Sequence, residues 1–366
     1  MAHLRPLTST DIPDVARLFH KVFNGGKGPV SPEVVSYLRA LYVDHLACAA
    51  DIPPLVYLDQ GDRILGFIGR HAIPFARGEE PLRAALCSTI MVDADARDPL
   101  AGARLLRGAF DGPQDFTFTE SALDVSLHMW RSAGAVPIAG HSLDWLYPIR
   151  PVTFAVEITG KRHRLSPVLR PLAKAADRLV NRFTKPEMAA APRQRTAAGQ
   201  SEVSVTSADD FTDHFQALIG RFPLQPKWRT EQLRALVAEA SAKQKFGQPV
   251  FGSVHKAGRL LGAFFYHVRP GGVARVVQLL ALPGAESEVF SHLLNHASDM
   301  QASAVRGRVQ PFLMDCMLGR RVVLLNAAST LVHTRNPKLM AELSQGQGFL
   351  NGLAGEQWSR LLGDVL

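Results

Sequence analysis

The sequence predicts an α/β protein of two successive units, each a mixed twisted sheet flanked by helices. The chain has 366 residues, more than one ordinary hydrophobic core spans. Apolar runs with strand spacing alternate with runs of helical spacing in the first half, as in a layered α/β fold. A similar order of elements returns after residue 201, at an offset of roughly 190 residues, which favours duplication of one fold.

The elements of the first half are predicted from periodicity and end signals. Apolar residues recur at helical spacing over Ile12–Phe23, and Gly25 follows as an end signal. Ser31 and Pro32 are typical of a helix start, so a second helix is expected to run to about residue 45. The other expected elements are strands at 4–7, 55–59, 64–73, 82–92, 116–119 and 136–147, and helices at 100–110 and 123–133.

The second half repeats this order of elements, without repeating residue identities. Its expected strands lie at 203–206, 249–255, 260–268, 274–281 and 322–333, and its expected helices at 209–219, 230–242, 286–300 and 313–318. The interval between the halves contains prolines, basic residues and one amphipathic helical pattern at 172–183. We therefore expect a first unit at 1–155, a basic linker at 156–200 and a second unit at 201–366.

The basic residues are concentrated in one part of the chain. Residues 151–200 hold 10 Lys and Arg against 3 Asp and Glu, whereas residues 1–150 hold 14 against 17. This distribution argues against nucleic-acid binding by the protein as a whole. A solvated tether is the first interpretation of the basic segment. The alternatives are contact of 161–185 with an anionic membrane surface and contact of the basic linker with RNA.

Cysteine content and hydropathy indicate the cellular compartment that we expect for the protein. Cys48, Cys87 and Cys316 are widely spaced and form neither a disulfide framework nor a metal-binding pair, so no metal is expected. No apolar run approaches 18 residues, and the N-terminal residues lack a hydrophobic signal core. These features predict a cytoplasmic protein without a transmembrane segment.

One strand–loop–helix segment, at 84–110, has the pattern of an anion site. The apolar strand ending at Val92 runs through a polar loop into a helix with small residues at Ala101, Gly102 and Ala103. Small residues allow a ligand to approach the backbone, and the helix start favours an anion. Arg97 can add a charge-assisted contact.

This segment resembles the GNAT superfamily of N-acetyltransferases, in which a Gln/Arg-x-x-Gly-x-Gly/Ala loop binds the coenzyme A pyrophosphate. Here the loop reads Arg97-Asp98-Pro99-Leu100-Ala101-Gly102, with Leu100 in place of the middle glycine. The resemblance implies that Arg97, Asp98, Leu100, Ala101, Gly102 and Ala103 form the pyrophosphate site. It also implies that Ile90, Met91 and Val92 lie on a strand that diverges from its neighbour and holds the pantetheine arm. The fold class implied is a tandem pair of GNAT-like acyl-CoA N-acyltransferase folds.

The catalytic residues are less well marked. In the family a tyrosine on a later helix commonly protonates the leaving thiolate, and Trp130 stands at the matching position. The resemblance therefore implies that Trp130 contacts the bound acyl-CoA. An indole N–H donates a hydrogen bond but is not an acid, so the resemblance supplies no general acid. Asp93, Glu120 and His128 remain the candidates for proton handling, since such groups must lie within hydrogen-bond reach of the reacting atoms.

The resemblance implies an acyltransferase that moves an acetyl or other acyl group from acyl-CoA to a small-molecule or peptide amine. Two alternatives remain open. The departures at Leu100 and Trp130 favour a non-catalytic pair of domains that acts as a binding module. A Fem-type aminoacyltransferase, which also contains tandem GNAT folds, would use the basic linker to contact RNA.

Overall fold

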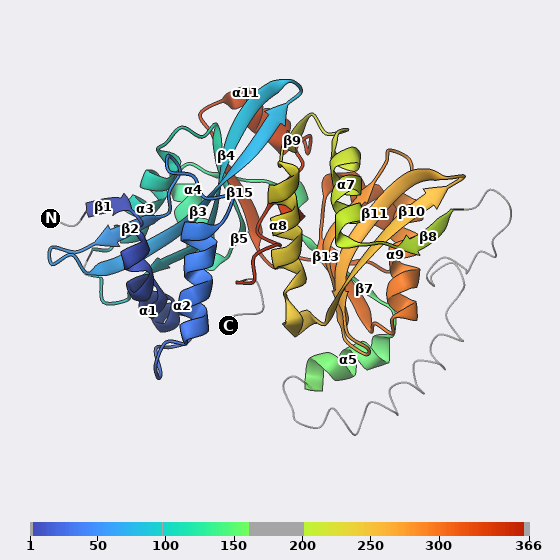
Figure 1. Cartoon of the computed structure of the whole chain (residues 1–366), viewed down its shortest axis with the longest axis horizontal. Coiled ribbons are helices and arrows are strands. Elements are labelled where there is room, and N and C mark those ends of the chain that lie inside the picture. The colour runs from blue at the N-terminus through green and yellow to red at the C-terminus, as the bar shows by residue number, and fades with distance from the viewer. Residues whose placement is uncertain (1–2, 97, 161–200, 362–366) are drawn as a thin grey trace.

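The computed structural model describes residues 3–96, 98–160 and 201–361. Figure 1 shows two twisted sheets side by side, each with helices packed on it. The predicted mixed α/β class is confirmed. Within the described residues, no helix is long and apolar enough to cross a membrane. The predicted amphipathic helix at 172–183 lies outside the described residues.

The first sheet has the order β1-β2-β3-β4-β5-β15-β6, and β9 pairs with β3. All neighbouring pairs are antiparallel except β4 and β5, which are parallel. The strands are β1 (His3–Pro6), β2 (Leu55–Leu58), β3 (Ile64–Arg77), β4 (Glu80–Val92), β5 (Phe116–Ala122), β6 (Val136–Pro137), β9 (Leu224–Pro226) and β15 (Ser329–His333). Its helices are α1 (Ile12–Phe23), α2 (Pro32–Arg39), α3 (Ala101–Phe110) and α4 (Asp124–Ser132).

The period-2 alternation of the central strands separates two hydrophobic cores. Phe67 and Met91 face α1 and pack in one cluster with Phe19. Ile68, which follows Phe67 in β3, faces the opposite side and packs in a second cluster with Cys87 of β4 and Leu105 of α3. Because successive side chains of a strand point to opposite faces, β3 and β4 carry helices on both sides of the sheet.

The second sheet has the order β14-β7-β13-β12-β11-β10-β8. Here β12 and β13 form the parallel pair, in the position that β4 and β5 hold in the first sheet. Its strands are β7 (Asp144–Pro148), β8 (Glu202–Val205), β10 (Gln248–Lys256), β11 (Arg259–Val268), β12 (Val273–Ala281), β13 (Ala304–Arg308) and β14 (Val323–Leu325). The remaining helices are α5 (Pro151–Gly160), α7 (Ala208–Ile219), α8 (Thr230–Ser241), α9 (Glu286–Asp299), α10 (Met314–Met317) and α11 (Pro337–Ser344).

The two halves of the chain exchange strands. β7 precedes residue 155 but pairs with β13 and β14 of the second sheet. β15 follows residue 201 but pairs with β5 and β6 of the first sheet. Each sheet thus contains strands from both halves of the chain. The predicted domain boundaries at 155 and 201 therefore stay a prediction.

Two long strands expected from the sequence are each divided in the structure. The run 136–147 contains β6, a 3₁₀ turn at Ala139–His141 and the start of β7. The run 322–333 contains β14 and β15, which belong to different sheets. In both runs the chain passes from one sheet to the other. The β-rich composition continues through this passage, so local periodicity does not predict it.

Residues 355–361, here called the C-terminal segment, are irregular and pack against the first sheet. Its anchor is Trp358, which is 1% exposed. The indole stacks on His45 with ring centroids 4.7 Å apart and meets His71 edge-on at 5.1 Å. Burial lowers the pKa of His45 to about 4 and that of His71 to about 3, so both rings are neutral at pH 7.

These histidines predict a loss of stability in acid. Between pH 6.5 and about 3 the unfolded chain protonates His71 and the folded chain does not, so the free energy of unfolding falls as pH falls. Each such group contributes a slope of about 1.4 kcal/mol per pH unit. Urea unfolding of a His71→Asn variant from pH 6 to 4.5 should show a shallower dependence than the wild type. A His71→Asn variant with the same slope as the wild type would contradict the argument.

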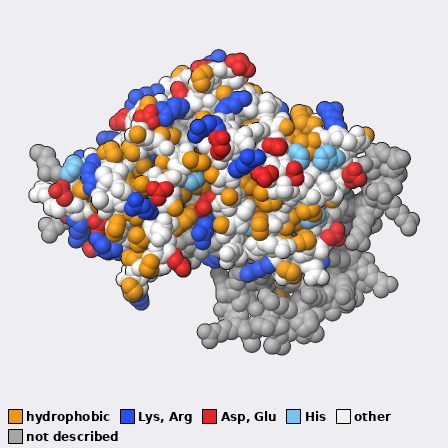
Figure 2. Space-filling model, in the orientation of Figure 1, with side chains coloured by type: hydrophobic (Ala, Val, Ile, Leu, Met, Phe, Trp, Pro, Cys, Tyr) orange, Lys and Arg blue, Asp and Glu red, His pale blue; other side chains and the backbone are white. Residues whose placement is uncertain are grey.

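The surface carries both signs of charge. Figure 2 shows Lys and Arg side chains interspersed with Asp and Glu over the visible face of the molecule. This face presents no continuous basic surface of the kind that binds a nucleic-acid backbone. The basic segment 161–200 lies outside the described residues.

Candidate active-site cleft

The cleft arises where two parallel strands part. β4 and β5 pair from Ala84 opposite Phe116 to Leu86 opposite Phe118. Beyond Leu86, β4 remains paired with β3 only, while β5 turns away and pairs with β15. The divergence exposes one edge of each strand, and a cavity of about 330 Å³ opens between them.

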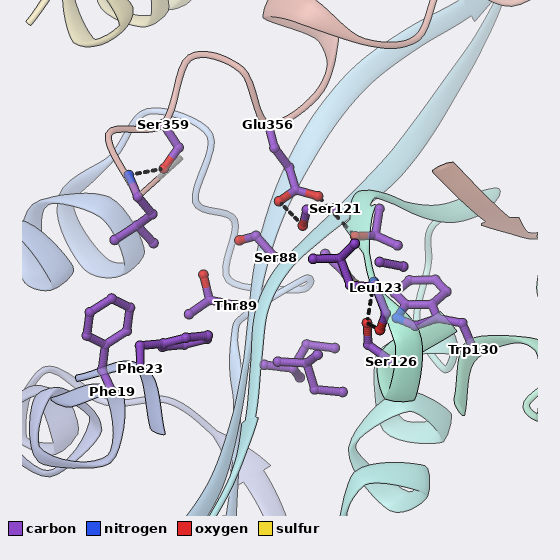
Figure 3. Close-up of a pocket in the computed structure, with 16 residues that line it drawn as sticks. Phe19, Phe23, Ser88, Thr89, Ser121, Leu123, Ser126, Trp130, Glu356 and Ser359 are labelled. Atoms are coloured by element: carbon purple, nitrogen blue, oxygen red, sulfur yellow. Dashed lines mark hydrogen bonds between the residues drawn. The ribbon is translucent and has the colours of Figure 1, made fainter. Parts of the chain in front are cut away.

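Side chains from five parts of the chain line this cavity, and Figure 3 shows how they converge. One part of the wall is apolar and comes largely from α1, β4 and α4. Hydroxyl groups and one carboxylate form the rest. The apolar lining residues are Phe19, Phe23, Ile68, Cys87, Ile90, Ala122, Leu123, Trp130 and Leu361, and the polar ones are Ser88, Thr89, Thr119, Ser121, Ser126, Glu356 and Ser359.

A β-bulge shapes the β4 side of the cleft. The register with β3 shifts so that Thr89 and Ile90 together oppose the single residue Ile68. Thr89 has a φ of +52°, a left-handed conformation that is costly for a β-branched residue. Tyr42 supports it, because its hydroxyl donates to Thr89 Oγ1 at 2.7 Å. The bulge directs Ser88, Thr89 and Ile90 toward the cleft.

Glu356 supplies the carboxylate of the cleft, and sequence reasoning missed it. It belongs to the irregular C-terminal segment and is 3% exposed. Its Oε1 accepts from the Thr119 hydroxyl at 3.0 Å and from the backbone N–H of Glu120 at 2.8 Å. Its Oε2 accepts from the Ser121 hydroxyl at 2.8 Å. Burial raises the pKa of Glu356, although these hydrogen bonds oppose the shift.

Glu120, a predicted candidate for proton handling, lies directly behind this carboxylate. Its Oε2 accepts from the backbone N–H of Glu356, and Gly355 passes so close that a Cβ there would overlap the Glu120 carboxyl. Burial raises the pKa of Glu120 to about 7, with Glu356 adding to the shift and Arg308 opposing it. Glu120 is not among the residues that line the cavity. The structure therefore makes it a neighbour of Glu356, on the far side from the open space.

The other two candidates lie away from the cleft. Asp93 forms an ion pair with Lys21 at 2.6 Å and accepts from the Asp95 amide. Burial would raise the pKa of Asp93, but these partners more than offset it and leave the pKa below its usual range. His128 lies on the exposed face of α4. Neither side chain lines the cavity.

Trp130 and Ile90, predicted to contact the acyl donor, both line the cavity. Trp130 projects from α4, is 2% exposed and packs edge-on against Phe110 with centroids 5.2 Å apart. Met91 alternates to the α1 side and is buried in the core, and Val92 is half-buried at the end of β4. The role of these residues in ligand binding stays a prediction.

The start of α3, predicted as the pyrophosphate site, holds a carboxylate of its own. Asp98 Oδ1 accepts from the Leu100 N–H at 2.9 Å. Its Oδ2 accepts from Tyr57 at 2.5 Å and pairs with Arg104 at 3.0 Å. The Tyr57 hydrogen bond and the Leu100 amide lower the pKa of Asp98, so the group is ionised at neutral pH. A phosphate at this end of the helix would meet that negative charge.

The small residues of α3 serve packing as well. Ala101 is 1% exposed, and Gly102 is buried where a Cβ would overlap the end of the Met129 side chain on α4. Ala103 is half-buried and Leu100 is exposed. Arg97 lies outside the described residues. The ligand contacts predicted for this loop therefore remain untested, while Gly102 has a packing role that the sequence did not reveal.

The comparisons with known proteins concern the fold. No family model matches the sequence, and no curated protein matches it either. A GCN5-related N-acetyltransferase from Kribbella flavida aligns with a TM-score of 0.53 at 12% identity, over 91% of this chain and 71% of its own. A probable N-acyltransferase of unknown function from Enterococcus faecalis gives 0.58 at 8% identity, over 91% and 73%. A GCN5-related N-acetyltransferase from Anabaena variabilis gives 0.57 at 10%, over 92% and 73%.

The chain thus has the fold of GCN5-related N-acetyltransferases, as its loop and element order implied. Each match extends over at least 91% of the chain, so both sheets take part in the similarity. The paired sheets agree with the predicted tandem arrangement. At identities of 8–12% the similarity establishes the fold, and function must be argued from the cleft.

Proposed function

We propose that the chain transfers an acetyl or other acyl group from acyl-CoA to an amine in the cleft between β4 and β5. The observation that carries this proposal is Glu356, a buried carboxylate at the point where two parallel strands part. A base in such a place can receive the proton that an amine must lose when it becomes an amide. Within the described residues, no cluster of His, Cys, Asp or Glu suits a metal ion, and the proposed reaction uses none.

The residues of the cleft have separate parts in the reaction. The amine nitrogen attacks the thioester carbonyl carbon, a C–N bond forms, and the C–S bond breaks to release the CoA thiolate. The proton lost by the amine passes to the Glu356 carboxylate. Backbone N–H groups at the bulge of Thr89 and Ile90 would stabilise the developing oxyanion.

The tryptophan at position 130 is compatible with this scheme. A thiol has an ordinary pKa of about 8.5, so its thiolate is an adequate leaving group near neutral pH without a dedicated acid. Trp130 then acts as an apolar wall of the cleft. The combination of apolar walls with one carboxylate suits an acceptor, small molecule or peptide, that presents a neutral amine on an apolar body.

One observation favours the non-catalytic alternative, a binding module. Asp98 places a negative charge at the helix start that would face the donor pyrophosphate. A module that lost coenzyme A would retain the cleft without using Glu356 as a base. For the Fem-type alternative, the supporting segment at 161–200 lies outside the described residues. The cytoplasmic setting predicted from the sequence is kept as part of the proposal.

Donor binding is tested by titration calorimetry with acetyl-CoA and CoA. Leu123 lies at the cavity wall and is 54% exposed, whereas Val125, two residues on, is 73% exposed and does not line the cavity. A Leu123→Trp variant should fill the entrance and weaken acetyl-CoA binding by about tenfold. Val125→Trp should bind as the wild type does. Absence of heat at millimolar ligand would refute donor binding, and equal affinities of the two variants would place the donor elsewhere.

A further inference from the structure

The carboxyl groups of Glu120 and Glu356 connect β5 to the C-terminal segment through each other's backbone. Glu356 Oε1 accepts from the Glu120 N–H at 2.8 Å, and Glu120 Oε2 accepts from the Glu356 N–H. Gly355 allows this approach, because a Cβ there would overlap the Glu120 carboxyl. Glu120 is 2% exposed and Glu356 is 3% exposed. Two buried carboxyl groups therefore lie next to each other at the cleft.

These two carboxyl groups differ in the donors that they meet. Within the described residues, Glu356 accepts three hydrogen bonds. Their donors are the Glu120 N–H, the Thr119 hydroxyl and the Ser121 hydroxyl, and Figure 3 shows the last of these contacts. In the same part of the chain, Glu120 accepts at Oε2 only, and its Oε1 is buried without a hydrogen-bond partner. Because hydrogen bonds favour the charged form and an unpaired buried oxygen is costly, Glu356 ionises more readily than Glu120.

A second unpartnered acceptor lies close to Glu120. Asn351 is fully buried, and its side-chain amide lies beside the Glu120 carboxyl. The Asn351 Nδ2 donates to the His141 carbonyl oxygen at 3.1 Å, and its Oδ1 has no partner among the described residues. A protonated carboxyl can donate a hydrogen bond, which a carboxylate cannot. A proton on Glu120 thus adds a donor where two buried acceptors lack one.

Cationic side chains border the pair on two sides. Arg308 of β13 donates to the Glu120 carbonyl oxygen and pairs with Asp144 at 3.2 Å. Lys243, which follows α8, donates to the carbonyl oxygen of Gln357 in the C-terminal segment. Both cations are bound to other groups, and both favour ionised carboxylates nearby.

Burial outweighs these contacts at Glu120. Burial and the neighbouring Glu356 raise the pKa of Glu120 to about 7, although Arg308 and the Asn351 amide oppose the shift. The His141 ring adds no charge at pH 7, because burial lowers its pKa to about 4. The environment of Glu120 therefore agrees with its lack of donors.

We propose that the pair retains one proton near neutral pH, that Glu120 holds this proton, and that neutral Glu120 positions the ionised Glu356. Glu120 Oε2 holds the Glu356 N–H, and its neutral state leaves the negative charge on Glu356. A second charge at Glu120 would repel the Glu356 carboxylate. Protonation of Glu120 does not depend on any activity, whereas its effect on turnover rests on the proposed function.

The first test measures the unfolding equilibrium of the full chain in urea from pH 5 to 6.5. Between pH 4.5 and about 7, folded Glu120 retains a proton that the unfolded chain has released, so its contribution to stability falls as pH rises. Glu120→Gln removes this titration. The unfolding constant of the wild type should therefore rise relative to that of the variant by about tenfold per pH unit.

Glu356→Gln is the matched comparison for the unfolding test. This variant should keep most of the wild-type pH dependence, because burial still acts on Glu120. Loss of the dependence in Glu356→Gln with its retention in Glu120→Gln would place the proton on Glu356 and overturn the proposal. The wild-type dependence in both variants would overturn it as well.

Infrared spectroscopy of the wild type gives a reading that needs no variant. A protonated carboxyl has a carbonyl stretch that a carboxylate lacks. This band should be present at pH 6, where carboxyl groups with ordinary pKa values of about 4 are ionised, and should be lost well above pH 7. Absence of the band at pH 6 would reject a retained proton.

Kinetic measurements test the positioning role. Glu120→Ala removes the acceptor of the Glu356 N–H and should lower kcat at least about tenfold, with the KM for acetyl-CoA within about twofold of the wild type. Glu120→Gln keeps a neutral side chain with an oxygen for this N–H and should restore most of the lost turnover. A Glu120→Gln variant as slow as Glu120→Ala would reject the positioning role. An inactive wild type that shows the expected unfolding and infrared results would count against the proposed function and leave the proton on Glu120.

Discussion

Replacing Glu356 with Gln should lower the rate of acyl transfer by at least about a hundredfold and leave acetyl-CoA affinity nearly unchanged. Removal of a positioned base costs about that much. Gln keeps the length of the side chain and can still accept from Thr119 and the Glu120 N–H, so the segment should stay folded. Steady-state kinetics and titration calorimetry on the same preparation measure the two quantities.

A matched control and a pH profile sharpen this prediction. Glu342→Gln changes a partly buried carboxylate on α11 that pairs with Arg77, far from the cleft, and should retain wild-type turnover. The wild-type rate should rise with pH through the raised pKa of the carboxyl pair, because the base must be ionised to accept a proton. Glu120 and Glu356 interact, so the profile reports the pair as a unit. Undiminished turnover of the Glu356→Gln variant would show that Glu356 is not the base of the reaction.

Those elements of the fold that depend on residues close together in the chain could be predicted from the sequence. The helix Ile12–Phe23 was predicted with its observed bounds, because its apolar spacing and its end signals are encoded within a few residues. The family resemblance implied that Ile90 and Trp130 contact the acyl donor; both line the cleft, and the contact itself stays a prediction. Such features depend on neighbours in the chain, which the sequence displays directly.

The residue that carries the proposed chemistry could not be predicted in this way. Glu356 meets the Glu120 amide across 236 residues of chain. Nothing in the surrounding Gly-Glu-Gln-Trp marks it, since the segment has neither helical nor strand periodicity. The strand exchange of β7 and β15 is non-local in the same sense. Long-range packing decides these positions, and the closest sequence signal is Gly355, whose missing Cβ allows the approach to Glu120.

The same dependence explains the outcome at the predicted pyrophosphate loop. The resemblance implied that Asp98 belongs to the pyrophosphate site, and the structure shows that its carboxylate binds Tyr57, the Leu100 amide and Arg104. Tyr57 comes from β2, about forty residues earlier in the chain. A residue that weakens one interpretation of a motif can thus have a structural role that only its tertiary partners reveal.

Replacing Trp358 with Ala should destabilise the protein by about 3–5 kcal/mol, the usual cost of deleting a large buried aromatic side chain. Trp358 is 1% exposed and contacts two buried, neutral imidazoles, so the cavity left behind is lined by His45 and His71. Denaturant unfolding measures the change. Trp358→Phe retains an aromatic ring at this position and should lose much less.

Kinetic measurements on the Trp358→Ala variant test whether Trp358 also holds the Glu356 carboxylate in position, apart from its effect on the stability of the fold. Trp358 lies two residues after Glu356, so release of the indole should displace the carboxylate from Thr119 and Ser121. We therefore expect Trp358→Ala, assayed below its unfolding temperature, to bind acetyl-CoA and lose turnover nearly as fully as Glu356→Gln. The double variant Trp358→Ala, Glu356→Gln should then be little slower than either single variant, because both remove the same interaction. Multiplicative losses would instead show that the segment and the carboxylate act independently.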